Sequence, residues 1–148
     1  MKQLFLVLFF IFSVQGNSQQ LQTYSFEQVE QLVGKNPRPI LLYFYTDWCR
    51  YCKMLQKSTF KDSKVIEKLN KYYYVIFFKG DSTETIHHLH QKFKFVPTGI
   101  KSGYHEVVYH YLGKRQEIYP TIIFLDEHFK EILFLQSYLS SEELLEIL

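Results

Sequence analysis

The amino-acid sequence predicts one α/β domain, with a central mixed β-sheet of about four strands flanked by helices. Three observations support this fold class. The chain of 148 residues is long enough for one compact domain. Hydrophobic residues make up 47% of it and charged residues 22%, a composition typical of globular proteins. Uninterrupted apolar runs alternate with segments whose apolar residues recur at helical spacing.

Strands buried on both faces are predicted where apolar residues run without polar alternation. Three such runs cover residues 40–45, 73–78 and 121–125, and a fourth strand is predicted at 130–136. The first two are joined by helical segments, so we expect them to be parallel neighbours. The last two are joined by the short turn 126–128, so we expect an antiparallel hairpin.

Helices are predicted where apolar residues recur three or four positions apart. A capping box at 25–28 opens the first helix, which ends at Gly34 and Pro37. Residues 81–83 are typical capping residues, and Ile86, Leu89 and Phe93 follow at helical spacing. The predicted helices cover residues 26–33, 49–55, 62–72, 81–93, 104–112 and 140–148.

The first 18 residues have the order of a secretory signal peptide. Lys2 gives a positive start, the apolar run 4–12 follows, and small or polar residues occupy 13–20. The apolar run is about half of the ~20 residues that a membrane-spanning helix needs, so we favour a cleaved signal over a stable membrane anchor. We therefore expect a single exported domain at 19–148, periplasmic or extracytoplasmic. The net charge of +2 gives no case for nucleic-acid binding.

The chemistry is predicted at the only two cysteines, Cys49 and Cys52, which follow a buried strand and open a helix. The helix N-terminus favours an anion, which lowers the pKa of the Cys49 thiol and makes it the expected attacking group. Cys52 lies one turn later and is the expected resolving thiol. Arg50 and Tyr51, between them, are expected to tune the reduction potential.

Two other uses of the cysteine pair are less favoured. A structural bridge would close a very short loop, and disulfide stabilisation grows with loop length. A zinc site would need two further ligands, and the chain has no second cysteine pair, although it has six histidines. We expect no metal and no cofactor apart from a redox-active Cys49–Cys52 disulfide.

The stretch 39–53 resembles the active-site strand and helix start of thioredoxins. It is most similar to the C-terminal domain of the bacterial thiol:disulfide interchange protein DsbD and its exported thioredoxin-like relatives. These proteins also carry an acidic residue and Trp before the first Cys, Lys after the second, and then the pattern seen here at 59–65, Thr-Phe-Lys-Asp-Ser-Lys-Val. The resemblance covers residues 37–148 and implies a thioredoxin-like fold with dithiol–disulfide exchange.

The same resemblance implies a cis-proline that faces the cysteine pair and shapes a substrate groove. Both Pro97 and Pro120 have suitable neighbours. We choose Pro120 because it begins a buried strand, whereas the residues after Pro97 do not form one. Trp48 and Tyr119 are then expected to line the groove, and a packing role for Trp48 is compatible with this.

The chain departs from the family pattern in two places. Many thioredoxins have a buried Asp in the active-site strand, and Tyr43 occupies that position here. A Tyr with an ordinary pKa near 10 is a poor base at neutral pH, so Asp47, Lys53 or water must assist Cys52. The stretch Phe95–Lys114 is an extra helical and loop insertion before the cis-proline. It is either a lid beside the groove or a surface insertion.

The expected function is an exported thiol–disulfide oxidoreductase, a dithiol reductase of protein disulfides. Its electrons would come from an unidentified donor, such as a membrane thiol–disulfide transporter. The alternatives are an oxidase or isomerase with the same centre, and a non-catalytic thioredoxin-fold binding module or metallochaperone. We expect a monomer. Three histidines of the predicted helix 81–93 are expected on its solvated surface: His87, His88 and His90.

Overall fold

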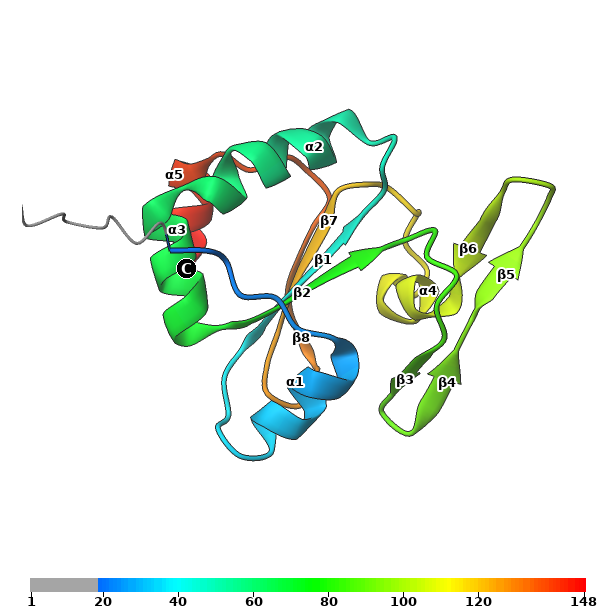
Figure 1. Ribbon diagram of the computed structural model, residues 1–148, viewed down its shortest axis with the longest axis horizontal. Helices are drawn as coiled ribbons and strands as arrows, with labels where there is room; N and C mark the ends of the chain where they lie inside the picture. Colours follow the sequence, from blue (N-terminus) through cyan, green and yellow to red (C-terminus); the bar gives the residue numbers. More distant parts are fainter. Residues whose placement is uncertain (1–18) are drawn as a thin grey trace, which may run out of the picture.

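The computed structural model describes residues 19–148, and the predicted signal peptide lies outside this range. The elements follow one another in the order shown in Figure 1. They are α1 (Phe26–Val33), β1 (Ile40–Tyr45), α2 (Arg50–Lys57), the 3₁₀ helix η1 (Thr59–Lys61), α3 (Ser63–Tyr72), β2 (Tyr74–Lys79), β3 (Ile86–His88), β4 (Gln91–Phe93), β5 (Phe95–Pro97), β6 (Gly103–His105), α4 (Glu106–Leu112), β7 (Thr121–Leu125), β8 (Glu131–Leu135) and α5 (Ser141–Ile147).

The central sheet has four strands in the order β2-β1-β7-β8. β1 runs parallel to β2, with Ile40 opposite Tyr74 in the register. β7 is antiparallel to both β1 and β8. The predicted mixed sheet, with parallel neighbours first and an antiparallel hairpin last, is therefore confirmed.

Side chains of β1 alternate between two hydrophobic cores. Leu41 and Tyr43 pack with α2, α3 and α5 on one face. Ile40, Leu42 and Phe44 pack with α1 and α4 on the other face. Figure 1 shows the two groups of helices on opposite sides of the sheet. Because both faces of β1 are covered, its sequence is apolar at every position.

The predicted helix at 81–93 is wrong, because this segment contains the antiparallel hairpin β3–β4. Its turn residues Leu89 and His90 have φ values of 50° and 61°. Two consecutive positive φ angles are typical of a two-residue type I′ hairpin turn. Leu89, which completed the helical spacing, is exposed in this turn, while Ile86 and His88 are buried with the two-residue periodicity of a strand.

The insertion Phe95–Lys114 begins with a second hairpin, in which residues 98–102 form the loop between β5 and β6. β5 and β6 pair antiparallel, and α4 begins only after them. A Cβ atom on Gly103 would lie 2.6 Å from the Val96 carbonyl oxygen, so glycine allows the two strands to approach. α4 ends at Gly113, as predicted, with a φ of 61°. The insertion is thus one hairpin and a helix, and Figure 1 shows this hairpin and the preceding hairpin β3–β4 to one side of the central sheet.

His88 is buried at 1% exposure, so its predicted place on a solvated helix surface is also wrong. Its Nδ1 contacts the Glu30 carboxylate of α1, and its Nε2 lies 2.5 Å from the Tyr111 hydroxyl of α4. His88 therefore links α1, the β3–β4 hairpin and α4.

This buried histidine predicts a loss of stability in mild acid. Burial lowers the pKa of His88, and the nearby Glu30 offsets only part of the effect. Below the ordinary histidine pKa of about 6.5 the unfolded chain therefore binds more protons than the folded chain. The free energy of unfolding consequently decreases as the pH is lowered. We expect the melting temperature to fall between about pH 7.5 and about pH 5, more steeply in the wild type than in His88→Gln.

His87→Gln is the matched control, because His87 is exposed beside it. This variant should keep the wild-type slope of melting temperature against pH. Burial also lowers the pKa of His110, so His88→Gln should retain a smaller slope rather than none. Equal slopes in the wild type and His88→Gln would contradict the prediction.

Candidate active site

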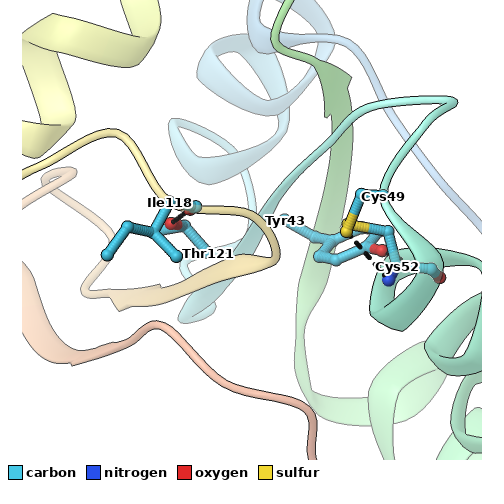
Figure 2. Close-up of a disulfide and its surroundings, with 5 residues drawn as sticks. All are labelled: Tyr43, Cys49, Cys52, Ile118 and Thr121. Atoms are coloured by element: carbon cyan, nitrogen blue, oxygen red, sulfur yellow. Dashed lines mark hydrogen bonds between the residues drawn. A yellow bond between two sulfur atoms is a disulfide. The ribbon is translucent and has the colours of Figure 1, made fainter.

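The two cysteines lie where β1 passes into α2 and form a disulfide (Figure 2). Cys49 is the N-cap of α2, and its Sγ accepts a hydrogen bond from the Cys52 backbone N–H at 3.1 Å. The Cys49 residue is 5% exposed and Cys52 is completely buried. A partner molecule can therefore reach the pair only from the side of Cys49.

The surroundings of Cys49 favour its thiolate once the disulfide is reduced. Its sulfur lies at the N-terminus of α2, where the peptide dipoles point their positive ends. The first turn of α2 holds no acidic residue, and Arg50 follows Cys49 directly. Arg50 and Tyr51 are both exposed beside the disulfide. In general, a helix N-terminus and a neighbouring cationic side chain stabilise the thiolate form of a cysteine.

Tyr43 lies fully buried on the inner side of the disulfide. Its hydroxyl donates a hydrogen bond to the Cys52 carbonyl oxygen at 3.2 Å. Its ring packs against Phe60 and Phe77, with centroids 5.1 and 4.8 Å apart respectively. Burial raises the pKa of Tyr43 far above its usual range. Tyr43 is thus a packing and hydrogen-bonding residue that stays protonated at neutral pH.

The side chains of the two residues predicted to assist proton transfer point to other surroundings than the cysteines, and only the Lys53 backbone N–H bonds to Cys49, donating to its carbonyl oxygen at 3.2 Å. Asp47 is exposed, and its carboxylate pairs with Lys79 at the end of β2. Lys53 is exposed on α2. Within residues 19–148, neither side chain forms a hydrogen bond with Cys49 or Cys52. Their role in proton transfer stays a prediction.

The loop before β7 carries a cis peptide bond between Tyr119 and Pro120. The Thr121 hydroxyl donates to the Ile118 carbonyl oxygen at 2.5 Å and closes this turn. Figure 2 draws this turn and the disulfide in one view, with the label of Tyr43 between them. Tyr119 packs against the hydrophobic cluster that contains both cysteines. The other candidate for the cis-proline, Pro97, instead lies in the short strand β5.

Trp48 is 73% exposed and makes an edge-to-face contact with Tyr119, at a centroid distance of 6.0 Å. A large, rigid and exposed aromatic side chain is a typical contact for a binding partner. The structure therefore brings together Trp48 and Tyr119 beside the hydrophobic cluster that contains both cysteines. The role of Trp48, Tyr119 and Pro120 as a substrate groove stays a prediction.

Two residues that hold Tyr119 in place, Glu117 and Gly80, were not predicted. Glu117 accepts hydrogen bonds from the hydroxyls of Tyr119 and Tyr109, at 2.6 and 2.7 Å. A Cβ atom on Gly80 would lie only 1.9 Å from the Tyr119 hydroxyl oxygen. Glycine at the end of β2 thus lets the Tyr119 side chain cross over it. The sequence feature that could have indicated this support is a glycine, Gly80, directly after a buried strand.

Gly80→Ala is therefore expected to displace Tyr119 and distort the loop of Pro120. We expect a loss of about tenfold in kcat/KM for reduction of a protein disulfide, because catalysis is sensitive to displacements of about 1 Å. Insulin reduction measures this rate. Gly34→Ala is the matched control, since its added Cβ would meet nothing closer than 3.7 Å. Equal rates for both variants would show that the position of Tyr119 is unimportant.

The insertion borders this site. A cavity of about 320 Å³ lies between the active-site residues Thr46, Trp48 and Tyr119 and the hairpin residues Phe95 and Gly103. Of the two expectations for the insertion, a place beside the groove fits this arrangement.

Among residues 19–148, no cluster of three or more His, Cys, Asp or Glu side chains could hold a metal ion. In the same range no helix has the length and apolar character needed to cross a membrane. The expected absence of a metal, a cofactor, a nucleic-acid partner and a membrane anchor stays a prediction.

The family model of the thioredoxin-like domain matches residues 26–148. This chain belongs to the thioredoxin-like family. The predicted family and fold are therefore confirmed, and the Cys49–Cys52 pair is the Cys-x-x-Cys centre of a family of thiol–disulfide oxidoreductases.

Part of this thioredoxin-like chain is similar to thiol:disulfide interchange proteins DsbD. It is 42% identical to DsbD of Campylobacter jejuni over 48 residues, and 37% identical to DsbD of Photorhabdus laumondii over 49 residues. Each match covers 32% of this chain and 8% of the relative. The matched region is thus less than a tenth of the length of these relatives.

Two solved structures show the same fold as this thioredoxin-like chain. A thioredoxin from Thermus thermophilus has a TM-score of 0.61 and 20% identity, covering 86% of this chain and 84% of that one. The oxidised C-terminal domain of DsbD from Neisseria meningitidis has a TM-score of 0.56 and 14% identity, covering 85% and 96%.

Proposed function

We propose that this thioredoxin-like protein is an exported dithiol reductase of protein disulfides. The observation that carries the proposal is the position of the cysteine pair. Cys49 is partly accessible at the N-terminus of α2, Cys52 is completely buried behind it, and the exposed Trp48 stands beside both. This arrangement suits one attacking thiol and one resolving thiol.

The proposed reaction has two exchange steps. The Cys49 thiolate attacks one sulfur of the substrate disulfide, forming a mixed disulfide and releasing the other substrate sulfur as a thiolate. Cys52 then loses its proton and attacks the Cys49 sulfur, which releases the second substrate thiolate and forms the Cys49–Cys52 disulfide. Two electrons pass to the substrate, and its two thiolates take up protons. Asp47, Lys53 and water remain the candidates for moving the Cys52 proton.

The substrate is proposed to lie along the exposed Trp48, the half-buried Tyr119 that contacts it, and the cis-proline Pro120 that follows. Export is proposed from the predicted signal peptide at residues 1–18. A reductase in an oxidising compartment needs its own electron supply. We propose a thiol–disulfide partner as the donor, and a membrane thiol–disulfide transporter would fit. The local similarity to DsbD supports this class of partner.

The reduction potential tests the direction of electron flow. Trp48 is the only tryptophan of the chain, so its fluorescence can report the redox state of the adjacent disulfide. In glutathione buffers, we expect a potential near that of thioredoxin, about −270 mV. A value near that of a strong oxidant, about −120 mV, would contradict the reductase.

A second candidate is an oxidase or isomerase that uses the same centre. Arg50 and the helix N-terminus, with no acidic residue in the first turn of α2, both stabilise the Cys49 thiolate. A stabilised thiolate makes the disulfide a better oxidant. The same potential measurement separates this candidate from the reductase. A binding module or metallochaperone would show no insulin reduction above that of Cys49→Ser.

A further inference from the structure

Charge is unevenly distributed along the chain. Residues 50–71, which form α2, η1 and α3, contain seven basic and two acidic residues. The rest of the chain contains ten basic and thirteen acidic residues. The small net charge of +2 therefore conceals a strongly positive segment that begins directly after Cys49. Its basic residues are Arg50, Lys53, Lys57, Lys61, Lys64, Lys68 and Lys71.

Six of these seven side chains are exposed, and Lys68 is half-buried with its Nζ donating to the Leu145 carbonyl oxygen at 3.2 Å. Within residues 19–148, none of the seven forms a salt bridge. Of the two acidic residues, Asp62 caps α3 and accepts hydrogen bonds from the backbone N–H groups of Lys64 and Val65. Glu67 is exposed. The positive charge is therefore largely uncompensated.

The seven basic residues lie on the consecutive elements α2, η1 and α3, and we call them together the basic face. Lys57 and Lys61 line one cavity of about 380 Å³, which has the aromatic rings of Tyr45, Phe60 and Phe77 in its walls. Lys64, Lys68 and Lys71 line a neighbouring cavity of about 460 Å³. In Figure 1, α2 and α3 lead away from the end of β1 that carries the cysteines. The basic face thus extends from the disulfide across one side of the domain.

This arrangement carries a cost within the fold. Lys53 and Lys57 lie four residues apart in α2, and Lys64 and Lys68 lie four residues apart in α3. Like charges at this spacing destabilise a helix. No carboxylate of the described chain relieves this repulsion through a salt bridge. The basic residues therefore do not serve the stability of the helices, and a contribution to binding a partner would explain their presence.

We propose that the basic face is the docking surface for an acidic region of the protein partner whose disulfide meets Cys49. The inference rests on the proposed function. Charge complementarity selects an acidic partner, and the position of Arg50 next to Cys49 brings the partner's sulfur atoms to the reactive end of the face. An anionic lipid surface would need no contact with the redox centre, so a protein is the favoured occupant.

Matched peptide substrates test the inference with the full-length protein. Two cyclic disulfide peptides differ only in whether three glutamates or three lysines flank the cysteines. Trp48 fluorescence follows their reduction by the reduced protein. At about 0.02 M salt we expect the acidic peptide to react at least about tenfold faster, because opposite charges steer association. The ratio of the two rates should approach one at about 0.5 M salt, where charges are screened.

Variants locate the effect on the surface. The triple variant Lys57→Gln, Lys61→Gln, Lys64→Gln should reduce the ratio at low salt by at least about threefold, and it leaves Arg50 and Lys53 beside the cysteines intact. The matched control is Lys35→Gln, Lys92→Gln, Lys130→Gln, which removes three exposed lysines elsewhere and should keep the wild-type ratio.

Equal rates for the two peptides at low salt would overturn the docking surface while leaving the proposed function intact. No reduction of either peptide would instead contradict the proposed function. Binding of the protein to vesicles with about one-third phosphatidylglycerol, lost in the triple variant, together with equal peptide rates, would assign the basic face to a membrane and overturn the inference.

Discussion

Cys49→Ser is expected to abolish reduction of insulin, with a loss of at least about a thousandfold, because nothing replaces the attacking sulfur. Cys49 is the cysteine with solvent access, and it lies at the helix N-terminus that favours its thiolate. Cys52 is completely buried behind it. Turbidity of precipitating insulin B chain measures the rate.

Cys52→Ser should also stop turnover, but for a different reason. Cys49 can still attack in this variant, and the mixed disulfide then persists because its resolving thiol is missing. Non-reducing gels should show a covalent complex with the substrate for Cys52→Ser and none for Cys49→Ser or the double variant. Complexes that form through Cys52 in Cys49→Ser would reverse the assignment of the attacking and resolving thiols. Trapped complexes would also identify the natural partners.

The central sheet was predictable because strands that are buried on both faces have continuous apolar runs in the sequence. β1 and β7 have covered faces, and their residues are apolar almost without interruption. The position of Cys49 at a helix start was predictable for the same reason, since the strand before it and the apolar spacing after it are both clear. The neighbouring residues do not indicate a cis peptide bond at Pro120, so its prediction rested on the family resemblance.

The hairpins β3–β4 and β5–β6 could not be predicted because they are short and depend on distant contacts. β3 and β4 have three residues each, too few to establish a two-residue periodicity. Ile86 and Phe93 face each other in the register, and the same two residues with Leu89 fit a helical spacing. His88 is buried because Glu30, 58 residues earlier, contacts its ring. Tertiary contacts of this kind override local preference.

The residues that hold Tyr119 in place were not predicted because they too depend on tertiary contacts. Gly80 and Glu117 act only through Tyr119, and the contact between Gly80 and Tyr119 joins residues far apart in the sequence. The basic face differs, because counting charges in the window 50–71 would have revealed it. Its nearness to Cys49 is also visible in the sequence, but its exposure and lack of salt bridges needed the structure.

Tyr43→Ala is expected to lower the free energy of unfolding by about 3–5 kcal/mol, the usual cost of removing a large buried aromatic side chain. Tyr43 is fully buried and packs against Phe60 and Phe77. Because whole domains are stable by only about 5–15 kcal/mol, this loss would remove a large share of the total stability. Urea denaturation with the disulfide intact measures it. Tyr72→Ala is the control, since Tyr72 is 50% exposed and should change stability by no more than about 0.5 kcal/mol.

Tyr43→Phe separates packing from the hydroxyl group. The ring remains, and only the hydrogen bond to the Cys52 carbonyl oxygen is lost, so we expect a cost of about 1 kcal/mol. Burial keeps the pKa of Tyr43 far above neutrality, so its hydroxyl carries no proton to or from Cys52 during exchange. The rate of insulin reduction between about pH 6 and about pH 9 should therefore follow the same curve in Tyr43→Phe and the wild type. A displaced curve would show that Tyr43 takes part in proton transfer, and would give this tyrosine the role that a buried Asp has in many thioredoxins.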